Sequence, residues 1–161
     1  MDERDELTAA VSRDAVSAAL DVLADWGGGL DVVTVPPDAG RYAAALEGIL
    51  RRIPDGWGRG FRHERGWYRL VVDLDARLVE LDPDYVVHQV KEKFGTLRFY
   101  CSPGGGPDSP AAESFDALVE ETQRASAAIC ERCGSPGALT ERNGWLKTLC
   151  AACDDACEES R

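Results

Sequence analysis

The chain has 161 residues, of which 44% are hydrophobic and 29% are charged; this is enough for one full-sized domain, or for a modest domain that carries a small metal module. The apolar content excludes wholesale disorder. The formal net charge of −11 argues against general binding to nucleic acid or to anionic lipid surfaces.

The expected location is the cytoplasm. The opening sequence MDERDELTAA is acidic, whereas a secretory signal would be basic and then apolar. The sequence also has no run of about 18 apolar residues, the length that crosses a membrane. In a reducing compartment, paired cysteines favour metal binding over disulfides.

The first half of the chain is expected to be mostly helical. Apolar residues at helical spacing, and proline or glycine at the ends of each run, define the elements. The β-branched run before two prolines is short, as in a strand or an extended segment. The expected elements are a helix at 5–26, an extended segment at 30–35, a helix at 39–52, a glycine-rich loop at 55–60 and a helix from 67 to 81.

The second half begins with a predicted hairpin. YVVHQV at 85–90 and TLRFYC at 96–101 are β-rich, and KEKFG joins them. SPGGGPDSP has the composition of a linker, and a fourth helical stripe from Phe115 to Ile129 runs into the first cysteine pair. The predicted fold class is α+β, divided into an α+β region at 1–101, a linker at 102–111, and a helix with a metal module at 112–161.

Four of the six cysteines form two Cys-x-x-Cys pairs, namely Cys130, Cys133, Cys150 and Cys153. Two such knuckles supply the four thiolates of a tetrahedral zinc site. Gly134 follows the first knuckle, a Pro-Gly pair opens a short hairpin, and the second pair starts a helix, where the dipole favours thiolate. This order predicts a treble-clef-like zinc finger. The alternative is a set of reduced thiols or a redox couple, for which a thioredoxin-like context is missing.

Four cysteine ligands fill the zinc shell, so the predicted zinc is structural, not catalytic. Cys157 could substitute as a ligand, although a bystander thiol is the simpler interpretation, and Cys101 is expected to be a strand-end core residue. Zinc-deaminase, His-Glu-x-x-His, Gly-x-Ser-x-Gly and Walker patterns do not occur. No catalytic residue is therefore assigned. An unfamiliar enzyme site near His63 and Trp67 is left open.

Two basic stretches are candidate partner-binding surfaces. Residues 51–69 carry six arginines against two carboxylates, interleaved with aromatic residues. The alternative is that these arginines pair with neighbouring carboxylates. The predicted hairpin adds three cations beside aromatic residues, which either face a partner or pack inward. The candidate residues are Arg59, Arg62, Arg65, Arg69, Lys91, Lys93 and Arg98.

VVHQVKEKFGTLRFY at 86–100, CERCG at 130–134 and GWLKTLCAAC at 144–153 together resemble a family of small uncharacterised bacterial and phage-encoded proteins. In that family a QVKEKFG-x-LRFY segment is paired with a C-terminal finger ending in Gly-Trp-x-x-Thr-x-Cys-x-x-Cys. The resemblance covers about residues 66–153. It implies the zinc finger and one continuous unit across the linker, and it implies no activity.

Three classes of function follow from these features. The preferred one is a non-enzymatic, zinc-stabilised protein-interaction module, such as an acidic inhibitor or immunity-type protein that binds a basic partner, for example a nuclease toxin. The second is a nucleic-acid-binding regulatory zinc-finger protein, which the net charge disfavours. The third is an enzyme with an unrecognised site.

Overall fold

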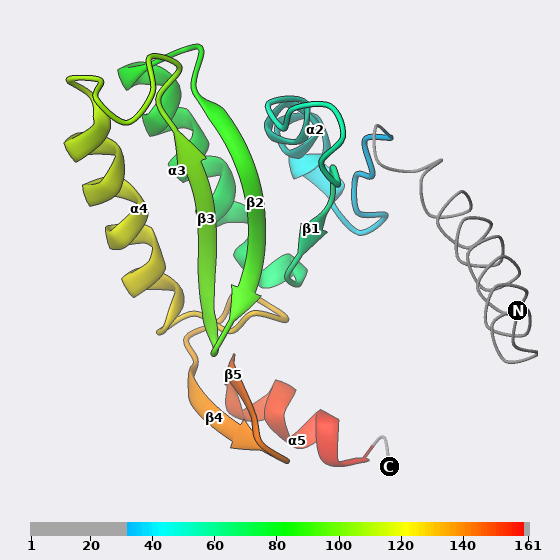
Figure 1. The fold of residues 1–161 in the computed structure, drawn as a ribbon. Helices are drawn as coiled ribbons and strands as arrows, with labels where there is room; N and C mark the ends of the chain where they lie inside the picture. The colour runs from blue at the N-terminus through cyan, green and yellow to red at the C-terminus, as the bar shows by residue number, and fades with distance from the viewer. Residues whose placement is uncertain (1–31, 160–161) are drawn as a thin grey trace, which may run out of the picture.

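The structure is a computed structural model that describes residues 32–159 (Figure 1). The helix predicted at 5–26 lies outside the described residues, as do the first two residues of the predicted extended segment. The elements in chain order are η1 (Gly40–Tyr42), α2 (Ala43–Arg51), β1 (Phe61–Arg62), η2 (Arg65–Trp67), α3 (Tyr68–Leu81), β2 (Val86–Lys93), β3 (Thr96–Ser102), α4 (Ala112–Ser126), β4 (Ala138–Arg142), β5 (Trp145–Leu149) and α5 (Ala151–Glu159).

The α+β class is confirmed, and the predicted helices at 39–52 and 67–81 correspond to η1 with α2 and to η2 with α3. Helix α3 buries Val71, Leu74 and Leu78, which lie on one helical face. It ends before Pro83 because a residue that precedes proline is disfavoured in the helical region, and Asp82 is already extended. No helix among the described residues is long and apolar enough to cross a membrane.

A three-stranded sheet in the order β1-β2-β3 forms the middle of the molecule. Strands β2 and β3 are antiparallel, which confirms the predicted hairpin, and β1 pairs in parallel with β2. The strands extend further than predicted, so that only Phe94 and Gly95 form the turn. Both have positive φ, 54° and 76°, which is the backbone of a type I′ turn. The two-residue strand β1 was not predicted.

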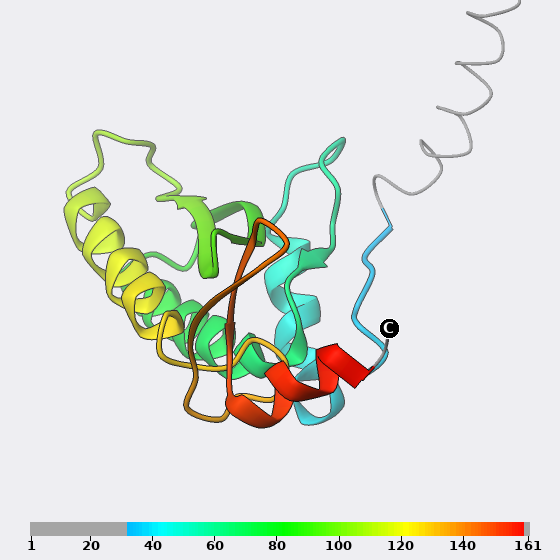
Figure 2. The same cartoon turned by 90° about the horizontal axis from the view of Figure 1, so that it is seen from below.

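One face of this sheet is covered by helices and the other is open (Figures 1 and 2). The core contains Trp67, Val90, Phe99 and Phe115. Helix α4 is tied to β3 because the Leu97 amide donates to Ser126 Oγ at 2.9 Å. The finger formed by β4, β5 and α5 lies beyond the β2–β3 turn, as Figure 1 shows.

Candidate metal centre

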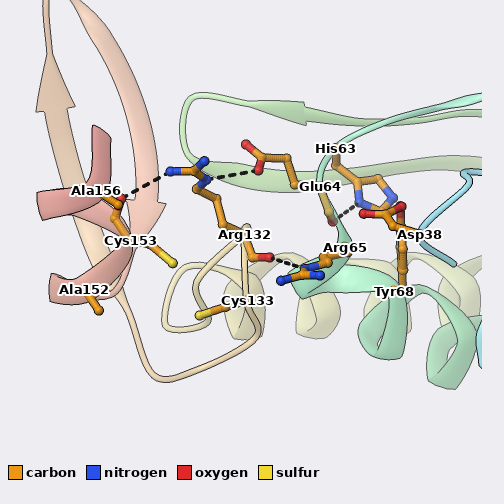
Figure 3. A pocket seen from close by; sticks show the side chains of 10 residues that line it. All are labelled: Asp38, His63, Glu64, Arg65, Tyr68, Arg132, Cys133, Ala152, Cys153 and Ala156. Atoms are coloured by element: carbon orange, nitrogen blue, oxygen red, sulfur yellow. Dashed lines mark hydrogen bonds and ion pairs between the residues drawn. The ribbon is translucent and has the colours of Figure 1, made fainter. Parts of the chain in front are cut away.

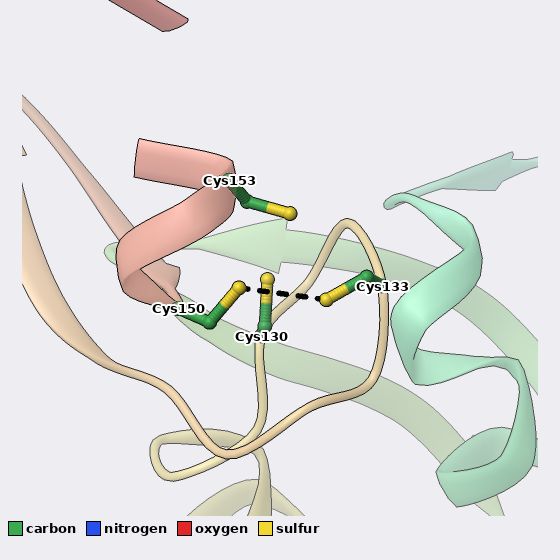
Figure 4. Close-up of side chains that lie close together, drawn as sticks. All are labelled: Cys130, Cys133, Cys150 and Cys153. Carbon is green, nitrogen blue, oxygen red and sulfur yellow. Dashed lines mark hydrogen bonds between the residues drawn. The ribbon is translucent and has the colours of Figure 1, made fainter. Parts of the chain in front are cut away.

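The four cysteine sulfurs of the two Cys-x-x-Cys pairs converge on one point (Figure 4). Their Sγ atoms all lie within 4.8 Å of one another, and those of Cys133 and Cys150 are 3.6 Å apart. Four sulfurs at about 2.3 Å from a tetrahedral zinc ion would be about 3.8 Å apart. The predicted ligands therefore form a cluster of a size that suits a metal ion.

The local sequence explains why the first pair forms a knuckle. The Gly134 amide donates to the Cys130 carbonyl at 2.9 Å, and the Cys130 amide donates to the Ser135 carbonyl at 2.7 Å. Gly134 has φ of +79°, a conformation that costs a residue with a side chain free energy. The second pair is carried by the start of α5, where the Asp154 amide donates to the Cys150 carbonyl.

The thiols of the cluster differ in exposure and in acidity. Cys130 is buried, Cys150 and Cys153 are half-buried, and Cys133 is exposed. Hydrogen bonds from Ser135 lower the pKa of Cys133 to about 6. Hydrogen bonds with the neighbouring sulfurs of Cys150 and Cys133 raise the pKa of Cys153 to about 12. Four thiolates this close repel one another unless a cation lies between them.

Glu131, inside the first knuckle, fastens the cluster to the rest of the fold. Its side chain is 1% exposed and accepts hydrogen bonds from Lys147 Nζ at 2.8 and 3.1 Å. Glu92 lies 3.4 Å from the same ammonium group, and the Glu64 amide donates to Glu131 Oε1 at 3.3 Å. This role was not predicted, because a glutamate between two cysteines has no pattern that marks it as buried.

The backbone of the knuckle is held by the segment that precedes α3. The Gly66 amide donates to the Glu131 carbonyl at 2.7 Å, and the Trp67 indole donates to the Ile129 carbonyl at 2.8 Å. A Cβ at residue 66 would overlap the carbonyl oxygens of Cys130 and Glu131. At the other end of the finger, Thr148 Oγ1 donates to the Gly95 carbonyl at 2.6 Å. The finger is therefore packed on the core and on the β2–β3 turn.

A cavity of about 560 Å³ lies between the knuckle, α5 and β1 (Figure 3). Its polar lining includes Asp38, His63, Glu64, Arg65, Tyr68 and Arg132. Arg132 pairs with Glu64 at 3.3 Å, and Tyr68 donates to Asp38 at 2.8 Å. Several of these polar groups thus already satisfy one another.

His63 lines this cavity and is the residue near which an enzyme site was left open. Burial lowers its pKa to about 4, and its Nδ1 contacts the Glu64 carbonyl at 2.9 Å. Its Nε2 is buried and has no hydrogen-bond partner among the described residues. A general base must reach the proton it removes, and solvent does not reach this nitrogen. The geometry thus favours a structural histidine.

The predicted arginine patch divides into separate groups. Arg59 pairs with Asp55 at 2.6 Å and donates to the Ile53 carbonyl. Arg65 donates to the Arg132 carbonyl at 3.3 Å, and Arg69 pairs with Asp73 on the surface of α3. Each of these three arginines therefore has an ion-pair or hydrogen-bond partner of its own.

Arg62, by contrast, joins two of the hairpin cations. The register pairs it with Lys91 on β2, and Lys91 with Arg98 on β3. Lys93 lies two residues beyond Lys91 and its ammonium group is 5.2 Å from the Phe94 ring centroid. The structure thus places four of the seven candidate residues together.

The remaining singled-out residues have structural surroundings. His88 lies at a bulge of β2, 3.0 Å from Ser102 Oγ, and its ring is 5.9 Å from that of Trp57. Cys101 packs against the core, as predicted, and burial raises its pKa to about 12. Nothing is described for the Cys157 side chain.

Two large aromatic side chains are exposed at the turns of the two hairpins. Phe94 is 63% exposed and Trp145 is 74% exposed. Between them is a hollow of about 360 Å³, the turn hollow, lined by Glu92, Lys93, Phe94, Gly144, Trp145 and Leu146. Phe94 was predicted only as part of the hairpin, and its proximity to Trp145 was not predicted.

Comparison with family models, with curated proteins and with solved structures finds no match for this chain. The resemblance of residues 66–153 to a bacterial and phage family therefore stays a prediction.

Proposed function

We propose that this protein is a non-enzymatic protein-interaction module, stabilised by a structural zinc ion, that contacts its partner through the turn hollow. The observation that carries the proposal is the pair of exposed rings, Phe94 and Trp145, on two turns that the fold brings together. Exposed aromatic residues of this size are typical anchors of protein interfaces.

The metal of the cluster is zinc in this proposal. Four thiolates are ligands of structural zinc, and a closed shell of four protein ligands leaves no position for a reacting water. The order of knuckle, β4–β5 hairpin and cysteine-bearing α5 supports a treble-clef-like finger. Zinc would hold the turn of β4 and β5, and with it Trp145, against the sheet.

Backbone strain at Phe94 supports a role outside folding. Phe94 has φ of +54°, in a region where a residue with a Cβ costs about 1 kcal/mol or more. A position i+1 in a type I′ turn favours asparagine, aspartate or glycine. An exposed phenylalanine here contributes little to the core, so the strain is consistent with retention for binding.

The partner is a protein with a basic surface around an apolar site. The net charge of −11 attracts such a partner at long range and raises the rate of association. The anchors then provide the short-range contact. The apolar parts of the partner's lysine and arginine side chains would also cover the rings of Phe94 and Trp145.

The test is affinity capture from the protein's own cells with three chains: the parent, Phe94→Gly with Trp145→Ser, and the control Leu81→Ser. Leu81 is also an exposed large apolar residue, but it ends α3 at the opposite end of the sheet. We expect the parent and the control to capture a basic protein. The variant Phe94→Gly with Trp145→Ser, the turn variant, should not capture it. Phe94→Gly should leave the chain as stable as the parent or up to about 1 kcal/mol more stable.

A second copy of the chain could occupy the hollow in place of a different protein. Sedimentation at increasing protein concentration tests this alternative. A parent that dimerises while the turn variant stays monomeric would replace the heterologous partner by a homodimer. A captured protein that the turn variant retains as well as the parent does would contradict the proposed site.

A further inference from the structure

The strands of the three-stranded sheet carry their positive charges on the open face and their one negative charge on the other face. The three strands contain four cations, Arg62, Lys91, Lys93 and Arg98, and a single carboxylate, Glu92. Successive residues of a strand point to opposite faces. Val90 and Phe99 pair with each other and face the core, so Lys91 and Arg98 face the open side.

The Glu92 side chain points away from the open face. It has the same parity as Val90, pairs with Leu97, and its carboxylate lies 3.4 Å from Lys147 on the finger. The open face therefore carries all four cations and no strand carboxylate. Among the side chains that the structure describes, no carboxylate forms an ion pair with any of the four cations.

The cations form a row across the sheet. Arg62, Lys91 and Arg98 are directly opposite one another on β1, β2 and β3. Neighbouring strands are about 4.8 Å apart, so the row spans about 10 Å, with Lys93 about 7 Å from Lys91 along β2. Like charges placed directly opposite one another destabilise a sheet. This arrangement is thus unfavourable unless an anion lies on it.

Aromatic rings accompany the row. Tyr100 is 42% exposed, has the same parity as Arg98, and its ring centroid is 5.5 Å from Lys91 Nζ. Ser102 also points to the open face, and His88 lies beside its hydroxyl group. The ring of His88 is next to that of Trp57, which is 54% exposed, so Trp57 lies at the end of the same face. Cations that alternate with exposed rings on a flat sheet suit a ligand with both phosphates and planar bases.

We propose that the open face binds single-stranded nucleic acid, with phosphates on the cationic row and a base stacked on Tyr100. Duplex fits less well because its bases are stacked and a three-stranded sheet is wider than the two-stranded ribbon that a major groove admits. An acidic protein segment would satisfy the charges and would leave the rings without a stacking partner. The overall negative charge of the chain limits this binding to low and moderate salt.

The test is fluorescence anisotropy with the zinc-loaded full chain and a labelled oligouridylate of about ten nucleotides. Between about 50 and 200 mM salt, three to four phosphate contacts predict a slope of log K against log salt of about −2 to −3. Lys91→Glu with Arg98→Glu should lower affinity at least about tenfold, and the neutral pair Lys91→Gln with Arg98→Gln should reduce the slope by about 1.4.

Arg69→Glu with Arg124→Glu is the control, since it changes the net charge of the chain by the same amount on α3 and α4. It should lower affinity much less than the Lys91 and Arg98 pair does. Tyr100→Ala should weaken oligouridylate binding at least about fivefold and leave the binding of polyglutamate unchanged. Circular dichroism of each variant confirms that the sheet is folded.

The proposal is overturned if the parent does not bind the oligonucleotide at low salt. It is also overturned if the control loses as much affinity as the variant Lys91→Glu with Arg98→Glu. Equal binding of polyglutamate, together with an unaffected Tyr100→Ala variant, would replace nucleic acid by an acidic protein ligand. The inference is independent of the turn hollow. The variant Phe94→Gly with Trp145→Ser should keep full affinity for the oligonucleotide, so that the two proposals can fail separately.

Discussion

The buried ion pair between Glu131 and Lys147 should determine how firmly the first knuckle is held to β5 and, through Glu92, to the sheet. Replacing Lys147 by methionine keeps most of the length of the side chain and removes the charge. Glu131, with 1% of its side chain exposed, would then be a buried carboxylate beside Glu92. Breaking a buried pair in this way costs about 3–5 kcal/mol; we expect about 3, because Lys147 is one-third exposed and water can partly replace it.

A double-mutant cycle isolates the pair. Glu131→Gln alone should cost about 1 kcal/mol, because Lys147 keeps its contact with Glu92. The double variant should be more stable than Lys147→Met, with a coupling free energy of about 2 kcal/mol. The measurement is urea unfolding at neutral pH with zinc in excess. The comparison variant is Arg77→Met, which breaks an exposed pair between α3 and α4.

The pH dependence of the Lys147→Met variant has a definite sign. Burial raises the pKa of Glu131 and Lys147 partly opposes that shift. Without Lys147 the folded state binds the Glu131 proton more tightly than the unfolded state does, so the free energy of unfolding falls more steeply as pH rises above about 4.3. A variant that loses no more stability than Arg77→Met, or whose pH dependence equals that of the parent, would refute the buried-pair argument.

Three further predictions concern the finger and its surroundings. Gly66→Ala should destabilise the chain by about 3 kcal/mol or more by forcing the knuckle away from the segment before α3, whereas Gly48→Ala, in open space on α2, should stabilise it by about 0.5–1 kcal/mol; urea unfolding of both variants checks this. Because the pKa of His63 is about 4 when folded and about 6.5 when unfolded, its contribution to stability is present above pH 6.5 and is lost as pH falls. His63→Phe should therefore flatten the pH dependence between about pH 4 and 6.5, by up to about 1.4 kcal/mol per unit near the middle of that range, and an unchanged slope would contradict the burial argument. Chelation of zinc should remove hydrogen-exchange protection from residues 130–159 before the sheet loses it, and Cys133→Ser with undiminished zinc content and protection would argue against the four-cysteine site.

Local patterns in the sequence were sufficient for the elements with strong periodicity. The stripe ending at Leu81 predicted α3, and the β-rich runs predicted the β2–β3 hairpin, because helix and strand periods depend on residues close in the chain. The predicted loop contains the turn, but the first strand was predicted to end three residues before β2 ends. The charged KEK run was assigned to the loop, although it continues β2 with alternate side chains in solvent and toward Lys147.

The four-cysteine cluster could also be found from the sequence, since each Cys-x-x-Cys knuckle brings its own two sulfurs together and only the pairing of two knuckles is non-local. The partner of Glu131 could not be found. Glutamate is rarely buried unless paired, and Lys147 lies on another strand of the finger, so neither residue alone indicates the contact.

The sequence by itself determined the helices, the long hairpin and the two cysteine knuckles, because the interactions that specify them are between near neighbours. Tertiary structure decided which cations share a face. Arg62 and Lys91 are adjacent only because β1 pairs with β2 in one register, and a shift of one residue would turn Arg62 toward the core. It also decided that Phe94 and Trp145 border one hollow, since packing of the finger on the β2–β3 turn brings two distant turns together.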